Sequence, residues 1–200
     1  GSALRANLDL GWVAANMAGA LAKQVLDFRR SDSRKVERLL FAGVVHDGVR
    51  MLEAVLPSSV SVVKTFDNTG AYVVCDASEV CQILVNIGKN ASDAMGLEGG
   101  TLTVRLDAVD LENPRQCSAT QLAPGPYVRL SIADTGEGMD DDTIARIFDP
   151  FFTTKPVGEG TGMGLSVVHG IVLDYNGAIC VSSTKGQGSV FDIYLPQSPN

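Results

Sequence analysis

The chain has 200 residues, of which 45% are hydrophobic and 20% charged, and its formal net charge is −7. This length and composition are typical of one globular domain with a short additional element, and they exclude a disordered chain. The negative charge argues against a nucleic-acid partner, because proteins that bind phosphate backbones usually present a basic face. No apolar run reaches the ~18 residues of a membrane span, and no signal peptide opens the chain. We therefore expect a cytoplasmic domain, which could belong to a membrane-anchored protein.

The cysteines offer no zinc site. Cys75, Cys81, Cys117 and Cys180 are widely spaced, form no CxxC pair, and are accompanied by only two histidines. Zinc sites in proteins usually need such pairs. We interpret all four cysteines as reduced, buried small residues in a reducing compartment.

The first predicted element is one long helix over residues 3–30, a stretch without proline. Its apolar residues recur at spacings of three and four, which indicates a helix with one apolar stripe. They are Leu4, Leu8, Ala15, Ala18, Ala22, Val25 and Phe28. Such a helix has no local partner, so we expect it to pack against a helix from another chain or another segment. Residues 29–35 are polar and predict a linker.

After the linker, short alternating stretches interleave with amphipathic ones. The turn at 67–70 predicts a hairpin between the strands on either side, and the polar, proline-containing stretch 112–126 predicts a variable loop. We expect strands at 36–41, 60–65, 71–75, 101–109, 127–133, 179–183 and 189–195, and helices at 44–55, 78–95, 141–147 and 164–176. This irregular order favours an α+β protein, a two-layer sandwich of helices on a mixed sheet, over a doubly wound fold.

Two asparagines mark the helix over 78–95. Asn86 and Asn90 are four residues apart in the stretch NIGKNASDAM, so they share one helix face. An amide oxygen is a suitable ligand for Mg²⁺, which takes its remaining ligands from water and substrate phosphates. The alternative is an ordinary helix surface that binds nothing.

A second polar segment, DTGEGM, begins with Asp134 directly after a predicted strand. A carboxylate buried at a strand end can accept a hydrogen bond from the amine of adenine. Gly136 and Gly138 allow a tight turn and a close approach to a flat ring. The alternative is an acidic surface turn.

Two further segments complete the pattern. The stretch FDPFFTTK, residues 148–155, places three phenylalanines before Lys155, which indicates a docked hinge whose lysine reaches phosphates, or else a hydrophobic corner of the core. The glycine-rich stretch 158–164 opens a helix, and a helix N-terminus favours an anion. A P-loop is excluded because no Gly-Lys-Ser/Thr follows, and a Rossmann motif because no βαβ unit surrounds the glycines.

In this order, the four segments resemble the N box, first glycine box, F box and second glycine box of the histidine-kinase ATP-binding domain. That family belongs to the Bergerat-fold superfamily, shared with gyrase, MutL and heat-shock chaperones. The resemblance is close over residues 76–196 and implies an α/β sandwich with ATP between the helix layer and a lid at about 150–161. It implies that Asn90 binds Mg²⁺, Asp134 binds adenine, and Lys155 with the 160–164 backbone binds the phosphates. The residues it places around ATP are Asn86, Asn90, Asp93, Asp134, Gly136, Gly138, Met139, Phe148, Thr154, Lys155, Gly160, Thr161, Gly162, Met163, Gly164 and Leu165.

The stretch LAKQVLDFRR, residues 21–30, resembles the end of the second helix of the dimerisation and phosphoacceptor hairpin in the same family. The resemblance divides the chain into residues 1–33, part of that hairpin and a linker, and residues 34–200, the catalytic domain. The phosphorylated histidine would then precede residue 1, so no catalytic residue is expected here. The implied partners are ATP, the phosphoacceptor helix or a homodimer partner, and a response-regulator receiver domain. The sequences FFTTK and GTGMGLSVVHGIV further resemble those of hybrid kinases of the VirA-like group.

Neither histidine is the expected phosphoacceptor. His46 precedes Asp47, which imitates a His-acid pair, but it follows the LDFRR stretch instead of preceding it. Its apolar neighbours Val44, Val45 and Val49 predict that it packs in the core. His169 lies after the second glycine segment and is interpreted as a structural residue close to the lid.

One residue, four positions before the expected magnesium ligand, distinguishes a kinase from an ATP hydrolase. Hydrolysing members of the superfamily place a glutamate four residues before the magnesium asparagine as a general base. Here that residue is Asn86, whose amide cannot accept the proton, so a kinase is favoured. The alternatives are a Bergerat-fold ATPase that uses nucleotide for conformational work, and a docking module that has lost ATP.

Overall fold

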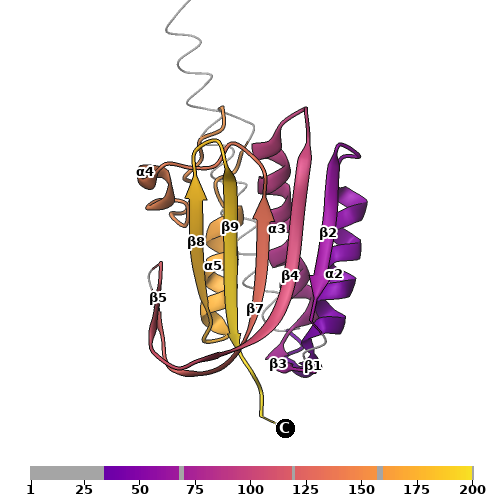
Figure 1. Ribbon diagram of the computed structural model, residues 1–200, viewed down its shortest axis with the longest axis vertical. Coiled ribbons are helices and arrows are strands. Elements are labelled where there is room, and N and C mark those ends of the chain that lie inside the picture. The colour runs from indigo at the N-terminus through magenta and orange to yellow at the C-terminus, as the bar shows by residue number, and fades with distance from the viewer. Residues whose placement is uncertain (1–33, 68–69, 119, 157–159, 200) are drawn as a thin grey trace, which may run out of the picture.

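The computed structural model describes residues 34–67, 70–118, 120–156 and 160–199. Within these ranges, a five-stranded mixed sheet carries three helices on one face, and no described helix covers its other face (Figure 1). The expected α+β two-layer sandwich is therefore confirmed. The long helix predicted over 3–30 lies outside the described residues. In the described part of the chain, no helix is long and apolar enough to cross a membrane.

The sheet has the strand order β2-β4-β7-β9-β8. Its first pair is parallel and its other pairs are antiparallel. The parallel pair requires a crossover connection, which contains helix α3. The strands are β2 (Val60–Phe66), β4 (Gly100–Leu111), β7 (Gly125–Asp134), β8 (Ala178–Thr184) and β9 (Gly188–Pro196).

The helix layer consists of α2 (Phe41–Val55), α3 (Ala77–Met95) and α5 (Gly164–Asp174), with a short α4 (Asp141–Ile144) at one end. Helix α3 begins where the side chain of Asp76 accepts a hydrogen bond from the Ser78 N–H, and it ends at Gly96. The apolar faces of α2, α3 and α5 form one core with the inward side chains of the sheet. This core includes Leu52, Leu84, Ile87, Leu102, Leu130, Ile132, Val168 and Ile193.

The predicted hairpin across residues 67–70 is wrong. Strand β3 (Tyr72–Cys75) pairs antiparallel with β1 (Glu37–Leu40), whereas β2 pairs with β4. Val73 and Cys75 are buried in the main core. Burial against distant residues therefore decides the pairing, and the local turn signal does not.

The stretch 112–126 is also more ordered than predicted. It holds a small antiparallel ribbon, β5 (Arg115–Cys117) with β6 (Thr120–Leu122). Cys117 of the ribbon is joined to Cys180 of β8 by a disulfide, so the prediction of four reduced cysteines is wrong for this pair. The two residues meet in a second, smaller apolar cluster that also contains Leu122, Tyr127, Ala178 and Tyr194.

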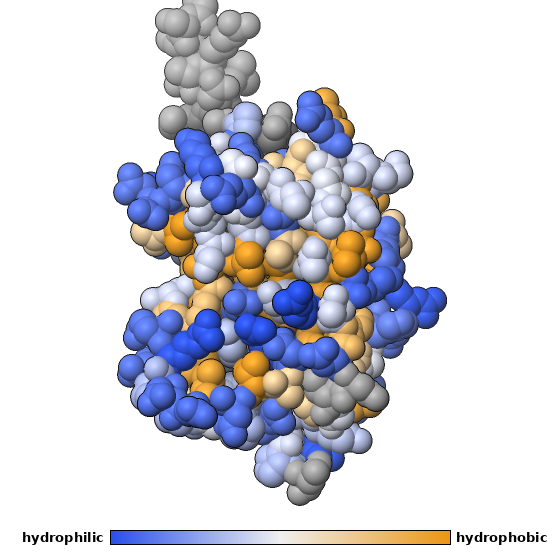
Figure 2. Space-filling model, viewed as in Figure 1, coloured by the Kyte–Doolittle hydropathy of each residue, from blue (hydrophilic) through white to orange (hydrophobic). Residues whose placement is uncertain are grey.

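The open face of the sheet is turned towards the reader in Figure 2, which shows apolar surface across its middle between two hydrophilic regions. The strand register aligns Val63, Thr103, Ala133 and Val190 in one row across this face. None of the four is fully buried. The site described below lies instead at the helices, the end of β7 and the loops that join them.

Candidate nucleotide-binding site

The asparagine face of α3 lies opposite the first residue of α5. Asn86 and Asn90 are both half-buried. A methyl group in place of a Gly164 α-hydrogen would lie 3.8 Å from Asn90 Nδ2 and 3.9 Å from the Cγ of Asn86. These are ordinary van der Waals distances, so the first residue of α5 lies close to the asparagine face of α3.

Helix α5 begins without a capping side chain, because its N-cap residue Met163 makes no side-chain hydrogen bond to the helix. The first N–H groups of a helix have no partner within it, and the helix dipole places partial positive charge there. An anion is therefore favoured at this point. The two segments, far apart in sequence, together present amide groups and a helix N-terminus to one region.

Asp134 lies at the end of β7 and is only 8% exposed. Its Oδ1 accepts hydrogen bonds from the N–H groups of Gly136 at 2.8 Å and Ser189 at 3.3 Å. Both bonds end on Oδ1, so Oδ2 can accept one from a ligand. Burial raises the pKa of this carboxyl, and the two backbone hydrogen bonds lower it only in part. The alternative of an acidic surface turn does not describe this residue.

The two glycines after Asp134 are needed for close packing. A Cβ at Gly136 would lie 2.8 Å from the carbonyl carbon of Ala94 in α3, and one at Gly138 would lie 2.1 Å from the Thr184 carbonyl oxygen. Gly138 also has a φ of 64°, which L side chains rarely adopt. The Glu137 N–H donates to the Ala94 carbonyl at 3.0 Å. The adenine-binding candidate is thus fixed to the same helix as Asn90.

The segment around the third motif is anchored by aromatic contacts. Phe148 stacks on His169 with ring centroids 4.7 Å apart, and the Arg146 guanidinium lies 4.4 Å from the Phe152 ring. Phe148 and Phe152 also pack against the main core. Phe151 is exposed instead, with a φ of 69°. Phe148 and Phe152 therefore fit the interpretation of this segment as a corner of the core, whereas the exposed Phe151 does not.

The third and fourth motifs are joined through their backbones. The Phe151 N–H donates to the Gly162 carbonyl at 2.9 Å, and a Cβ at Gly162 would lie 2.4 Å from the Phe151 carbonyl carbon. Of the other predicted residues, Thr154 and Thr161 are exposed, and Gly160 is half-buried beside Thr153. Met139 and Leu165 are half-buried and pack against the main core.

Lys155 and Asp93 form an ion pair with each other. Asp93 lies on α3 one turn after Asn90. The lysine is thus held next to the asparagine face by a carboxylate, and a triphosphate placed there would compete for it. Both side chains are partly exposed, which weakens such a pair.

The structure places the two histidines in different environments. The prediction that His46 packs in the core is wrong, because its side chain is 58% exposed and lies 3.7 Å from Asp47. His169 is half-buried and stacks on Phe148, and burial lowers its pKa.

The sequence analysis missed one residue of the candidate site, Ser189, whose N–H donates to Asp134 and whose side chain is buried. The only signal for it was its place in the predicted closing hairpin.

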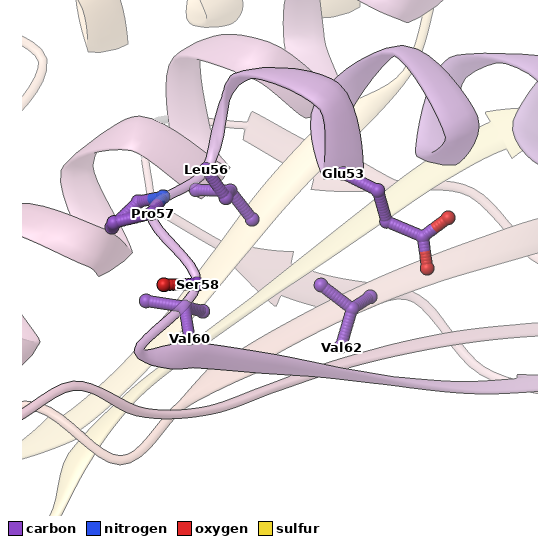
Figure 3. Close-up of a pocket in the computed structure, with 6 residues that line it drawn as sticks. All are labelled: Glu53, Leu56, Pro57, Ser58, Val60 and Val62. Atoms are coloured by element: carbon purple, nitrogen blue, oxygen red, sulfur yellow. The ribbon is translucent and has the colours of Figure 1, made fainter.

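One groove of about 230 Å³ lies elsewhere, between the end of α2 and the start of β2 (Figure 3). None of its lining residues belongs to the four motifs. They are Glu53, Leu56, Pro57, Ser58, Val60 and Val62. Glu53 is paired with Lys64 at 2.6 Å. We therefore place the candidate site at the motifs and not at this groove.

A two-layer sandwich that brings a buried aspartate, two asparagines and a glycine-rich helix N-terminus to one side defines an ATP-binding domain of the Bergerat type. The chain belongs to the family of histidine kinase-, DNA gyrase B-, and HSP90-like ATPases, whose model matches residues 75–199. The likeness to VirA-like hybrid kinases stays a prediction.

Two curated relatives are sensor kinases. The chain is 38% identical over 184 residues to the sensor kinase CckA of Brucella abortus, which covers 92% of the chain and 19% of that protein. It is 36% identical over 132 residues to the sensor histidine kinase ZraS of Escherichia coli, covering 66% of the chain and 24% of that protein. The chain thus spans about a fifth to a quarter of the length of these relatives.

Solved structures show the same fold at lower identity. Full-length ShkA in complex with AMPPNP matches with a TM-score of 0.69 and 23% identity, over 94% of this chain and 37% of that one. The mycobacterial sensor histidine kinase MprB matches with a TM-score of 0.64 and 24% identity, over 83% of this chain and all of that one.

Proposed function

We propose that this chain is the ATP- and Mg²⁺-binding catalytic domain of a sensor histidine kinase. It transfers the γ-phosphoryl group of ATP to a histidine outside this sequence, from which the group passes to an aspartate of a response-regulator receiver domain. The observation that carries the proposal is the position of Gly164, at the start of α5, opposite Asn86 and Asn90. The sensor-kinase relatives support the kinase reading over the other activities of the family.

Asp134 recognises the adenine ring in this proposal. Its Oδ2 accepts a hydrogen bond from the exocyclic amine, while Oδ1 stays bonded to Gly136 and Ser189. Since the surrounding loop is already packed against Ala94 and Thr184, little ordering is needed when the nucleotide binds.

The phosphates bind at the other end of the site. The N–H groups at the start of α5 donate to phosphate oxygens, and Lys155 leaves Asp93 to neutralise their charge. Catalysis then consists of holding the triphosphate in line with the incoming imidazole, because phosphoryl transfer depends mainly on positioning and charge neutralisation.

The residues present fit a magnesium ion that arrives with the nucleotide. Within the four described ranges, no group of three His, Cys, Asp or Glu side chains could hold a metal ion alone. Asn90 offers one amide oxygen, and Mg²⁺ normally takes its other ligands from phosphates and water. When bound, the ion would neutralise charge on the phosphates. Asn86 stands where a hydrolase would need a basic carboxylate, so water is not activated there.

The proposal also includes the domain division, with residues 1–33 belonging to the dimerisation region and residues 34–200 forming the cytoplasmic catalytic domain. The test is incubation of the chain with γ-labelled ATP, alone and with the phosphoacceptor segment of its parent protein. We expect ATP binding without label on this chain alone, and label on the added histidine. Stable label on this chain, or steady phosphate release that an Asn90→Ala variant abolishes, would overturn the kinase reading.

A further inference from the structure

Arg34 connects the beginning of the described chain to two helices at once. Its Nε and Nη2 both donate to Glu79 Oε2, at 3.0 and 2.7 Å, and its Nη1 donates to Asp174 Oδ2 at 3.2 Å. Its guanidinium carbon also lies 5.0 Å from the centre of the Tyr175 ring. Glu79 is in the first turn of α3, and Asp174 is the last residue of α5. One side chain therefore contacts the start of α3 and the end of α5.

The next residue is fixed as well. The Lys35 N–H donates to Asp76 Oδ2 at 2.7 Å, and the Asp76 N–H donates to the Tyr175 hydroxyl at 2.9 Å. The Tyr175 hydroxyl in turn donates to Glu79 Oε2. Burial and the bond to Glu79 raise the pKa of Tyr175 to about 12, so the hydroxyl keeps its proton at neutral pH. We call the set Arg34, Lys35, Asp76, Glu79 and Tyr175 the Arg34 clamp.

The clamp is linked to the candidate phosphate site by rigid elements. Asn90 lies further along α3 and Gly164 begins α5, and these two residues face each other. At 1.5 Å per residue, the distance along either helix from the clamp to this site is on the order of 15 Å. Arg34, near the end of the predicted linker, is thus held at the far ends of the two helices that carry the proposed ATP-binding residues.

We propose that Arg34 is a positioning residue, which fixes the point where the chain enters this domain, at Arg34 and Lys35, relative to the two helices that bind the triphosphate. This rests on the proposed function, because the preceding segment there belongs to the region that supplies the histidine. A flexible junction would let the γ-phosphoryl group and the imidazole sample many orientations, and loss of orientation alone lowers rates strongly. The clamp removes that freedom at Arg34 and Lys35.

A second arginine provides a matched control. Arg129 of β7 donates through Nε and Nη2 to the two oxygens of Asp107, at 3.1 and 2.7 Å. Exposures of the two pairs are similar, 26% and 21% for Arg34 with Glu79 and 28% and 16% for Arg129 with Asp107. Arg129 and Asp107 face each other across β4 and β7. Any general effect of losing a partly exposed ion pair should appear equally in both variants.

The experiment compares Arg34→Gln with Arg129→Gln in the full-length parent protein. We expect Arg34→Gln to lower the autophosphorylation rate at saturating ATP about 10-fold or more, with the Kd for Mg-ATP within about twofold of wild type. Arg129→Gln should change neither. Hydrogen exchange of the Lys35 amide should accelerate in Arg34→Gln alone. Where Arg34→Gln does not fold, Tyr175→Phe, which removes one hydroxyl, takes its place.

Two results would overturn the proposal. One is a wild-type transfer rate in Arg34→Gln. The other is an equal loss of rate in Arg129→Gln. Failure of the proposed function gives a different result, namely a wild-type protein that binds ATP and transfers no phosphate. In that case the Lys35 amide still tests the clamp, and unchanged exchange in Arg34→Gln refutes it.

Discussion

Asparagine in place of Asp134 separates recognition of adenine from the integrity of its loop. The amide oxygen of Asp134→Asn can still accept the hydrogen bonds from Gly136 and Ser189, but its second atom becomes a donor. A donor there faces the donating amine of adenine. A hydrogen bond to a charged group contributes ~1.5–3 kcal/mol. We therefore expect ATP to bind about 10- to 150-fold more weakly.

The same substitution should not destabilise the domain. Burial raises the pKa of Asp134 on folding, so its ionisation favours the unfolded chain. The stability contributed by this group is present below the unfolded pKa of ~3.9 and is lost as the pH rises through the higher folded value. At pH 7 the variant should therefore unfold at an equal or higher denaturant concentration than wild type. The difference in denaturant midpoint between the variant and wild type should shrink as the pH falls towards the pKa of the unfolded state.

Calorimetry with Mg-ATP and Mg-inosine triphosphate measures the affinity, because inosine has a carbonyl where adenine has the amine. Wild type should prefer ATP, and Asp134→Asn should lose that preference. Asp192→Asn, on β9, controls for the loss of one negative charge. Unchanged ATP affinity in Asp134→Asn, or an equal loss for both nucleotides, would refute the assignment of Asp134 to adenine.

Three further predictions concern the metal, the backbone and the thiols. Asn90→Ala should lose about 10-fold or more of the affinity that magnesium adds, measured by ATP titrations with Mg²⁺ and with EDTA; Gln82→Ala, on the same helix, should keep it. Gly138→Ala should lower the free energy of unfolding in urea by at least ~2 kcal/mol, because the alanine would have both a left-handed φ and a clash with the Thr184 carbonyl. Gly186 also has a left-handed φ but no neighbour within 4 Å of its Cβ position, so Gly186→Ala should lower it by only ~1 kcal/mol. Without reductant, the unfolded chain should titrate with two thiols, and with four after reduction; four at the outset would contradict the disulfide.

The helices and central strands were predictable because each carries a long periodic pattern. The helix expected over 78–95 forms over Ala77–Met95, and the closing hairpin expected at 179–195 forms from β8 and β9. Asp134 was found in sequence for a similar reason, since an aspartate at the end of an apolar strand is a local signal.

Two of the errors share one physical cause, which is contact between residues distant in sequence. The pairing of β3 with β1 and the meeting of Cys117 with Cys180 depend on which surfaces are buried together, and no local pattern contains that information. His46 is a different case. The buried positions of α2 are 41, 44, 45, 48, 49 and 52, which lie on one helix face, and position 46 lies on the opposite one. Adjacent apolar residues were misleading there, because sequence neighbours in a helix point about 100° apart.

The two ends of the proposed nucleotide site differ in how firmly their residues are held in this structure. At the adenine end, Asp134 is buried, bonded twice, and followed by glycines packed against α3 and Thr184. At the proposed phosphate end, the Lys155 ammonium forms a partly exposed ion pair with Asp93, for which a phosphate would compete. In the proposed function, the packed loop after Asp134 lowers the entropic cost of binding the base. An adaptable phosphate end suits the proposed function, in which the triphosphate is presented to a histidine from another segment.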